Sequence, residues 1–187
     1  GPAINDKTYI AAGRLHESQN RPLKAVEQYK LAIAAKPDNV EALNRLGIVL
    51  DRLGRFKEAD DAFKKAIQTA PKQGYLHNNL AFSYIMQSRW QDAEAALKKA
   101  IELSPTMARA QVNMAMALAQ QEKYDEAFGH FQAVLLPEDA YYNMGLMYQS
   151  KQKLAEAAKS FKTALTINPK MTAAQKRLEA MPKEAAT

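Results

Sequence analysis

The sequence has no cysteine, which excludes disulfide bonds, thiolate catalysis and cysteine-ligated zinc. A cysteine-free chain tolerates either redox environment, so a cytoplasmic and a periplasmic location both stay open. Apolar runs of about 18 residues, the length needed to span a bilayer, are also absent, and we expect no direct membrane insertion. The chain opens with Gly1-Pro2, which is typical of a protease scar. It therefore stays open whether the native protein carries a signal peptide, a lipid anchor or a further domain.

A concentrated charge of one sign is missing as well. The net charge is +6, and 25% of the residues are charged against 47% hydrophobic. These fractions are normal for a folded protein and too apolar for a disordered one. The positive surplus is spread along the whole chain, whereas a nucleic-acid surface usually shows a basic stripe. We therefore expect no nucleic-acid partner.

Motifs that carry catalysis or hold a cofactor are absent too. The sequence has no glycine-rich phosphate loop, no Gly-x-Ser-x-Gly and no His-Glu-x-x-His, and its three histidines are not spaced as metal ligands. The carboxylates at Glu58, Asp92, Glu126 and Glu156 recur at one place of a repeat, as on a solvated helix face, and no acidic pair breaks the period. The sequence predicts a protein that is not an enzyme and holds neither a metal ion nor a cofactor.

What the chain does have is an internal period. Residues that favour helices are abundant, and Pro37, Pro71 and Pro105 are 34 residues apart, with Pro169 a further 64 residues on. This spacing divides the chain into a lead-in at 1–5, five repeats, a capping helix at 172–181 and a frayed tail at 182–187. The repeats are 6–39, 40–73, 74–107, a shortened 108–137, and 138–171. We expect the second helix of the fourth repeat, or the connection after it, to be shortened.

Several places within each repeat, counted from its first residue, hold one kind of side chain. Place eight is small (Gly13, Gly47, Ala81, Ala115, Gly145), and place twenty is alanine (Ala25, Ala59, Ala93, Ala127, Ala157). Place twenty-four is bulky (Tyr29, Phe63, Leu97, Phe131, Phe161), and we expect it to fill the gap between successive hairpins. A proline follows the second helix and ends it. The turn between the two helices carries Asn20, Gly54, Ser88, Glu122 and Gln152.

In these places the sequence resembles the tetratricopeptide repeat family over residues 6–171. The family's tryptophan at place four is replaced by Tyr9, Leu43, His77, Gln111 and Tyr141. The resemblance implies an all-α, right-handed superhelical solenoid of antiparallel helix hairpins, with two helices per repeat and a final cap. Capping of the last repeat is expected because the end of such an array otherwise exposes apolar surface. The count is then eleven helices.

The resemblance also implies that the first helix of each hairpin lines a concave groove, through places two, five, six and nine. Asparagines there could grip the backbone of an extended peptide, because a carboxamide both donates and accepts hydrogen bonds. Apolar residues there could take its side chains, and we expect Asn79, Asn113 and Asn143 to face solvent in the free protein. The predicted groove residues are Asn44, Tyr75, Asn78, Asn79, Phe82, Arg109, Asn113, Met116, Tyr142, Asn143 and Leu146.

A basic residue recurs at place sixteen of every repeat, where it should lie at the edge on which the helix pairs turn. This secondary basic edge comprises Arg21, Arg55, Arg89, Lys123 and Lys153, and it is a weaker candidate for an acidic partner. The clamp that some family members use for a terminal carboxylate is not matched, because two of its cationic places are lost. The leading prediction is a scaffold that binds a protein or peptide. The alternatives are a self-assembling scaffold, which self-association would reveal, and a regulatory or substrate-recruiting array from a larger protein.

Overall fold

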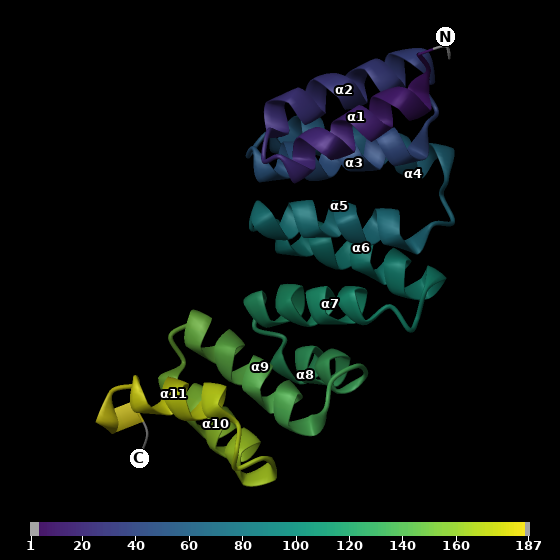
Figure 1. Ribbon diagram of the computed structural model, residues 1–187. Helices are drawn as coiled ribbons and strands as arrows, with labels where there is room; N and C mark the ends of the chain where they lie inside the picture. The colour runs from purple at the N-terminus through teal and green to yellow at the C-terminus, as the bar shows by residue number, and fades with distance from the viewer. Residues whose placement is uncertain (1–3, 186–187) are drawn as a thin grey trace. The chain divides into compact units, whose positions relative to one another are not determined.

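The computed structural model describes residues 4–185, so the predictions for residues 1–3 and 186–187 lie outside the part described. Within residues 4–185 the chain forms eleven α-helices and one short 3₁₀ helix, with no strand, and the expected all-α fold is confirmed (Figure 1). The helices are α1 (Asp6–Ser18), α2 (Pro22–Ala35), α3 (Val40–Arg52), α4 (Phe56–Thr69), α5 (Gly74–Met86), α6 (Trp90–Leu103), α7 (Ala108–Gln120), α8 (Tyr124–Gln132), α9 (Pro137–Ser150), α10 (Leu154–Ile167) and α11 (Thr172–Glu179), and the 3₁₀ helix is η1 (Lys183–Ala185).

The described chain divides into two compact units, an N-terminal unit of α1–α6 up to Pro105 and a C-terminal unit of α7–α11 from Thr106. In the N-terminal unit, α1 pairs with α2, α3 with α4 and α5 with α6. Each hairpin then packs on the next, α2 against α3 and α4 against α5. The unit is a stack of three antiparallel hairpins whose core lies between helices adjacent in the chain.

The C-terminal unit repeats the same arrangement. Here α7 pairs with α8 and α9 with α10, while α8 packs on α9 and α10 on α11. Helix α8 has 9 residues where its equivalents α2, α4, α6 and α10 have 14, so the expected shortening of the fourth repeat is confirmed in the second helix. The proline of this repeat has a different role: Pro137 is the first residue of α9. A proline fits there because the first N–H of a helix has no partner within the helix.

The turns between the two helices of a hairpin all have one backbone geometry. Gly54 has φ 71°, and the non-glycine residues at the equivalent turn place have φ between 55° and 62°. In each turn the next N–H donates to a carbonyl five residues back, as from Arg55 N to Leu50 O at 2.9 Å. This bond closes the first helix in a Schellman motif. The non-glycine residues in this left-handed conformation are Asn20, Ser88, Glu122 and Gln152.

The aromatic residues at place twenty-four lie inside their own hairpins. The rings of Tyr29, Phe63 and Phe161 are fully buried. Each lies against the glycine of the same hairpin's first helix, so closely that a Cβ built on that glycine would come 2.4–2.6 Å from a ring carbon. The repeat pattern predicts these rings in the gap between successive hairpins, whereas the structure shows this contact within the hairpin. Glycine at place eight makes room for the ring.

The last helix, α11, covers the apolar side of α10. Ala174 and Met181 belong to one buried cluster with Phe161, and Leu178 packs against that cluster. The tail after Pro182 was predicted to be frayed. In the structure, Lys183–Ala185 forms η1, and Ala185 contacts the same cluster, so this part of the prediction is wrong.

Candidate partner-binding surfaces

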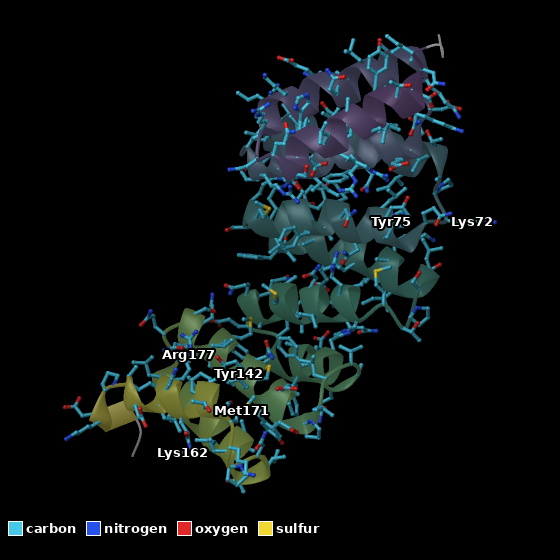
Figure 2. All side chains as sticks on the ribbon, viewed as in Figure 1. Lys72, Tyr75, Tyr142, Lys162, Met171 and Arg177 are labelled. Atoms are coloured by element: carbon cyan, nitrogen blue, oxygen red, sulfur yellow. The ribbon has the colours of Figure 1, made fainter. Side chains whose placement is uncertain are left out.

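One side of helix α5 carries large apolar side chains that the rest of the protein leaves exposed. Tyr75, Phe82 and Met86 expose 42%, 47% and 43% of their surface. Their spacing of seven and four residues places them on one face of the helix, with Asn79 among them. Tyr75 is labelled on α5 in Figure 2. Sequence reasoning had picked Tyr75 and Phe82 but missed Met86, although its position four residues after Phe82 carried the signal.

The asparagines predicted near this face are engaged within the protein. Asn79 donates from Nδ2 to Oδ1 of Asn44 at 2.8 Å, which ties the face of α3 to that of α5. Asn78 exposes only 2% of its surface. Asn78 therefore does not line a solvent-exposed groove, unlike the prediction from its place in the repeat.

Beside the α5 face, the equivalent face of α3 carries arginines. Arg45 and Arg52 both pair with Glu17 of α1, at 3.8 and 3.2 Å. Glu17 also accepts a hydrogen bond from the hydroxyl of Tyr29. Two guanidinium groups therefore share one carboxylate, while Glu41 on the same face of α3 pairs with Arg14 of α1. Three arginines face two carboxylates, which leaves one net positive charge on this side of the N-terminal unit.

In the C-terminal unit the predicted groove residues are more deeply packed. Asn113 exposes 5% of its surface, so the prediction that it faces solvent is wrong. Asn143 donates to the backbone oxygen of Asp139 on its own helix at 2.8 Å. Tyr142 packs its ring 5.6 Å from that of Phe161. Leu146 contacts the same core, Met116 is partly buried, and Arg109 is exposed.

The predicted basic edge proves to be the N-cap residues of α2, α4, α6, α8 and α10. Arg55 binds Glu58 with two hydrogen bonds of 2.7 Å, and this contact lowers the pKa of Glu58. Arg89 binds Asp92 at 2.9 Å and lies over the ring of Tyr84. These cations therefore already have acidic or aromatic partners on neighbouring turns, which weakens the basic edge as a partner site.

A buried acidic cluster joins the second and third hairpins of the N-terminal unit. Asp51 and Asp60 expose 5% and 6% of their surface, and the hydroxyl of fully buried Ser83 lies 2.7 Å from the first carboxylate and 3.1 Å from the second. Asp60 also accepts hydrogen bonds from Gln87 at 3.2 Å and Arg89 at 3.0 Å. This pair contradicts the expectation that no acidic pair breaks the period. The signal was there, because only the second repeat has acids at both places twelve and twenty-one.

The geometry of this cluster favours a proton on Asp51. A serine hydroxyl has one hydrogen, so Ser83 can donate to only one of the two carboxylates. With a proton on Asp51, that residue donates to Ser83 and Ser83 donates to Asp60, which satisfies both contacts. Burial raises the pKa of Asp51 to about 6, and the charge of Asp60 acts in the same direction, while the hydrogen bond from Ser83 lowers it.

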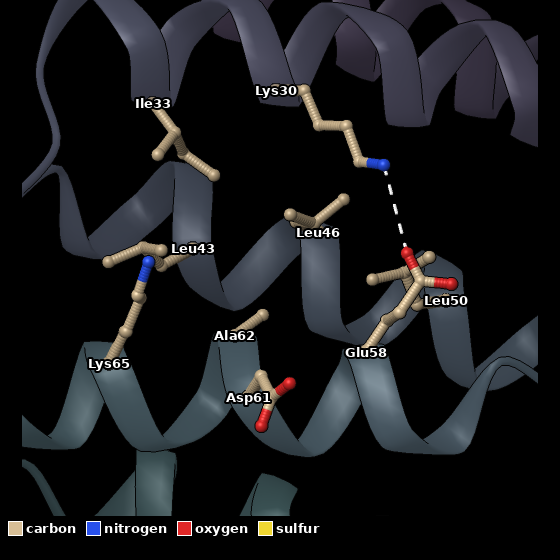
Figure 3. A pocket seen from close by; sticks show the side chains of 9 residues that line it. All are labelled: Lys30, Ile33, Leu43, Leu46, Leu50, Glu58, Asp61, Ala62 and Lys65. Atoms are coloured by element: carbon tan, nitrogen blue, oxygen red, sulfur yellow. Dashed lines mark ion pairs between the residues drawn. The ribbon is translucent and has the colours of Figure 1, made fainter.

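A pocket of about 250 Å³ opens between α2, α3 and α4 (Figure 3). Its apolar side chains come from all three helices, and the ion pair between Lys30 and Glu58, 3.7 Å long, lies at its rim. The sequence pattern does not predict this pocket, because its walls belong to helices of two different repeats. The residues around it are Lys30, Ile33, Leu43, Leu46, Leu50, Glu58, Asp61, Ala62 and Lys65.

Neither a metal site nor a membrane span is present in the described range. Among residues 4–185 no three His, Asp or Glu side chains gather in a way that could hold a metal ion. No helix in that range is both long enough and apolar enough to cross a bilayer. His130 donates a hydrogen bond from Nδ1 to Oε1 of Gln111 at 2.6 Å, and burial lowers the pKa of His130. His77 contacts the backbone oxygen of Pro71 at 2.9 Å.

Two family profiles match this chain. The tetratricopeptide repeat profile matches residues 10–74 and 79–143, and a second profile of that description matches residues 138–171. The chain belongs to the tetratricopeptide repeat family, whose members are in general non-enzymatic modules for protein interaction. No curated protein matches the sequence.

Solved structures show the same fold. YrrB, described as a tetratricopeptide protein with an unusual peptide-binding site, is 28% identical, with 92% of this chain and 91% of YrrB covered and a TM-score of 0.70. MamA is 27% identical over 86% of this chain and 96% of MamA, with a TM-score of 0.71. A MamA fragment from Desulfovibrio magneticus RS-1 reaches a TM-score of 0.76 at 19% identity, with 91% and 99% covered. The chain is a helical solenoid and a protein-interaction scaffold.

Proposed function

We propose that this chain binds segments of a partner protein on the faces that the first helices form within each unit, without catalysing a reaction. In the N-terminal unit the proposed site consists of Asn44, Tyr75, Asn79 and Phe82, to which we add Met86. In the C-terminal unit it consists of Arg109, Met116, Tyr142, Asn143 and Leu146. Asn78 and Asn113 are left out because both are buried.

The observation that carries this proposal is the uncovered apolar face of α5. Large apolar side chains that are exposed singly are common on protein surfaces, but three on one helical face form a contiguous patch. Aromatic side chains such as Tyr75 and Phe82 are enriched at the centres of protein interfaces. The hydrogen bond between Asn44 and Asn79 lies inside the patch. Its two side-chain amides can bond to the backbone of a partner in place of each other. The peptide-binding site described for YrrB is consistent with the proposal.

The proposal is tested by affinity capture from a cell extract, followed by calorimetry with the captured segment as a synthetic peptide. Replacing Phe82 with alanine should weaken binding at least about tenfold, equivalent to about 1.4 kcal/mol. Leu23→Ala is the matched control, because Leu23 is also exposed, at 62%, but lies on the second helix of the first hairpin. Equal losses in the two variants, or none in Phe82→Ala, would move the site away from this face. The pocket between α2 and α4 would then be the next place to look.

The asparagines allow a second, graded test. Replacing Asn79 with alanine removes one hydrogen bond to Asn44 and the amide that a peptide backbone would use. A net hydrogen bond is worth about 0.5–1.5 kcal/mol, so the affinity should fall by less than about tenfold. Because Asn79 is hydrogen-bonded in the unbound protein, the same change should also lower the free energy of unfolding by a similar amount. A thermal melt measures this loss of stability separately.

A further inference from the structure

The exposed apolar side chains of α5 lie in a row along the helix axis. This arrangement limits which kinds of segment can cover all of them. From Tyr75 to Met86 is eleven residues, or about 16 Å along the helix axis at 1.5 Å per residue. A strand that crossed α5 at a right angle could contact Phe82 and Met86, which are about 6 Å apart along the axis, but not Tyr75 as well. A segment that covers all three must run along α5.

A segment lying along this face needs its own backbone hydrogen bonds. Its contact residues Tyr75, Phe82 and Met86 offer side chains with little hydrogen-bonding capacity. The single amide pair on the face, Asn44–Asn79, can serve only one or two backbone groups of a segment that spans the face. A backbone N–H or C=O that is buried without a partner is costly. An α-helix satisfies these groups internally and presents side chains at spacings of three, four and seven residues, which match the spacing on α5.

The neighbouring helix sets the charge of such a segment. Arg45 and Arg52 stand on the face of α3 that corresponds to the apolar face of α5, and they share the single carboxylate of Glu17. The side chain of Arg52 is 63% exposed. Acidic residues along one edge of an incoming helix would meet this positive surplus, whereas lysines there would be repelled.

We propose that the α5 face binds an amphipathic helix of a partner protein, with its apolar side chains on Tyr75, Phe82 and Met86 and acidic side chains toward Arg45 and Arg52. This inference rests on the proposed function and names the kind of segment that is bound. The helix lies along α5, and ridges of side chains from the two helices interdigitate.

The test uses designed peptides with the full-length chain. The probe is a fluorescein-labelled peptide of about 18 residues, long enough to hold a helix, with leucines at positions i, i+4, i+7 and i+11 and glutamates along one flank. One matched peptide has the same composition with the leucines scattered around the helix. A second has two central prolines, which prevent the helix, and a third has glutamine in place of glutamate. Fluorescence anisotropy gives the affinities.

The expected result is saturable binding of the probe, with at least about tenfold weaker binding of the scattered and proline peptides. Phe82→Ala and Tyr75→Ala should each lower the affinity for the probe about tenfold, and Leu23→Ala should leave that affinity unchanged. Arg45→Gln and Arg52→Gln should remove the advantage of glutamate over glutamine. A circular dichroism melt of each variant confirms that a loss of affinity is not a loss of fold.

Three results would overturn the inference. If the proline peptide binds as tightly as the probe, the bound segment is extended, and the proposed function survives without the helix. If the probe does not bind, or binds Phe82→Ala as well as wild type, the α5 face is not a helix site, and the capture experiment decides the proposed function independently. If sedimentation shows a dimer that Phe82→Ala abolishes, a second copy of this chain occupies the face.

Discussion

The ring of Phe63 lies against Gly47 so closely that a Cβ on Gly47 would come 2.6 Å from its Cε1 atom. Gly47→Ala should therefore destabilise the second hairpin by about 1–3 kcal/mol, because one methyl group overpacks a buried contact. The third hairpin carries the combination Ala81 and Leu97 at the same places. Adding Phe63→Leu to Gly47→Ala should recover part of the loss, as urea denaturation of the two single variants and the double variant would show.

Gly129 provides the control for this prediction. It lies in α8, with no heavy atom within 4 Å of a Cβ built on it. Alanine there should stabilise the protein by about 0.5–1 kcal/mol, since glycine loses more conformational entropy than alanine in a helix. If Gly47→Ala and Gly129→Ala stabilise alike, the ring contact does not limit the hairpin.

The left-handed turns predict opposite effects at two equivalent places. Gly54→Ala should destabilise by about 1–2 kcal/mol, because φ of 71° is unfavourable for a residue with a Cβ. Glu122→Gly relieves similar strain at φ 62°. It also raises the conformational entropy of the unfolded chain, which offsets about 0.4–1 kcal/mol of that gain. We therefore expect a net stabilisation that is smaller than the loss in Gly54→Ala. Thermal melts measure both, and a loss of stability in Glu122→Gly would show that its side chain contributes more than the strain costs.

The buried pair Asp51 and Asp60 predicts a pH dependence. The pKa of Asp51 is raised to about 6 in the folded state from about 3.9 in the unfolded chain. The folded state therefore binds the extra proton, and this contribution to stability is fully present below about pH 4 and lost as the pH rises through about 6. The charged groups facing Asp51 are Asp60 and, beyond it, Arg89, with Ser83 and Gln87 as polar neighbours.

Asp51→Asn separates this contribution from the other carboxylates. The asparagine amide can donate to Ser83 as a protonated Asp51 would, so the variant should be more stable than wild type above about pH 7. The difference between the two proteins should shrink toward about pH 4. Urea denaturation at several pH values is the measurement, with the exposed Asp61→Asn as control. A difference that does not change with pH would mean that folding does not raise the pKa of Asp51.

The cap prediction concerns α11. Met181 is buried in the cluster that contains Phe161, so Met181→Ala should cost about 2 kcal/mol or more. In a stacked array each helix contacts only its neighbours, and amide hydrogen exchange should therefore speed up first in α10. Lys176→Ala, on the exposed side of α11, serves as the control. Unchanged protection of α10 in Met181→Ala would show that α11 does not cap the array.

The sequence predicted the helices well because the signals for them are local and recur. Pro37 and its equivalents end the second helices, and Gly54 and its equivalents mark the turns, whatever the neighbouring repeats do. The site was harder to predict. Phe82 was found because its place in the repeat sets its direction, but the burial of Asn78 depends on how helices of different repeats pack.

Contacts that exist in only one repeat were missed for the same reason. The Asp51–Ser83–Asp60 cluster needs acids at two places of one repeat and a serine from the next. Each of these residues alone is unremarkable in the period, and only the packing of α3, α4 and α5 brings them together. An alignment of the repeats shows what they share, so it does not reveal a combination that occurs in one repeat alone.

The pairing of helices that neighbour each other in the chain has a kinetic consequence. Within each unit the main helix contacts join elements adjacent or next but one in order, as in α1 with α2 and α2 with α3. Few long loops must close before these contacts form, so we expect a low barrier and fast folding. A hairpin needs little of the later chain to form. We therefore expect α1 and α2 to assemble on the ribosome while the later repeats are still being synthesised.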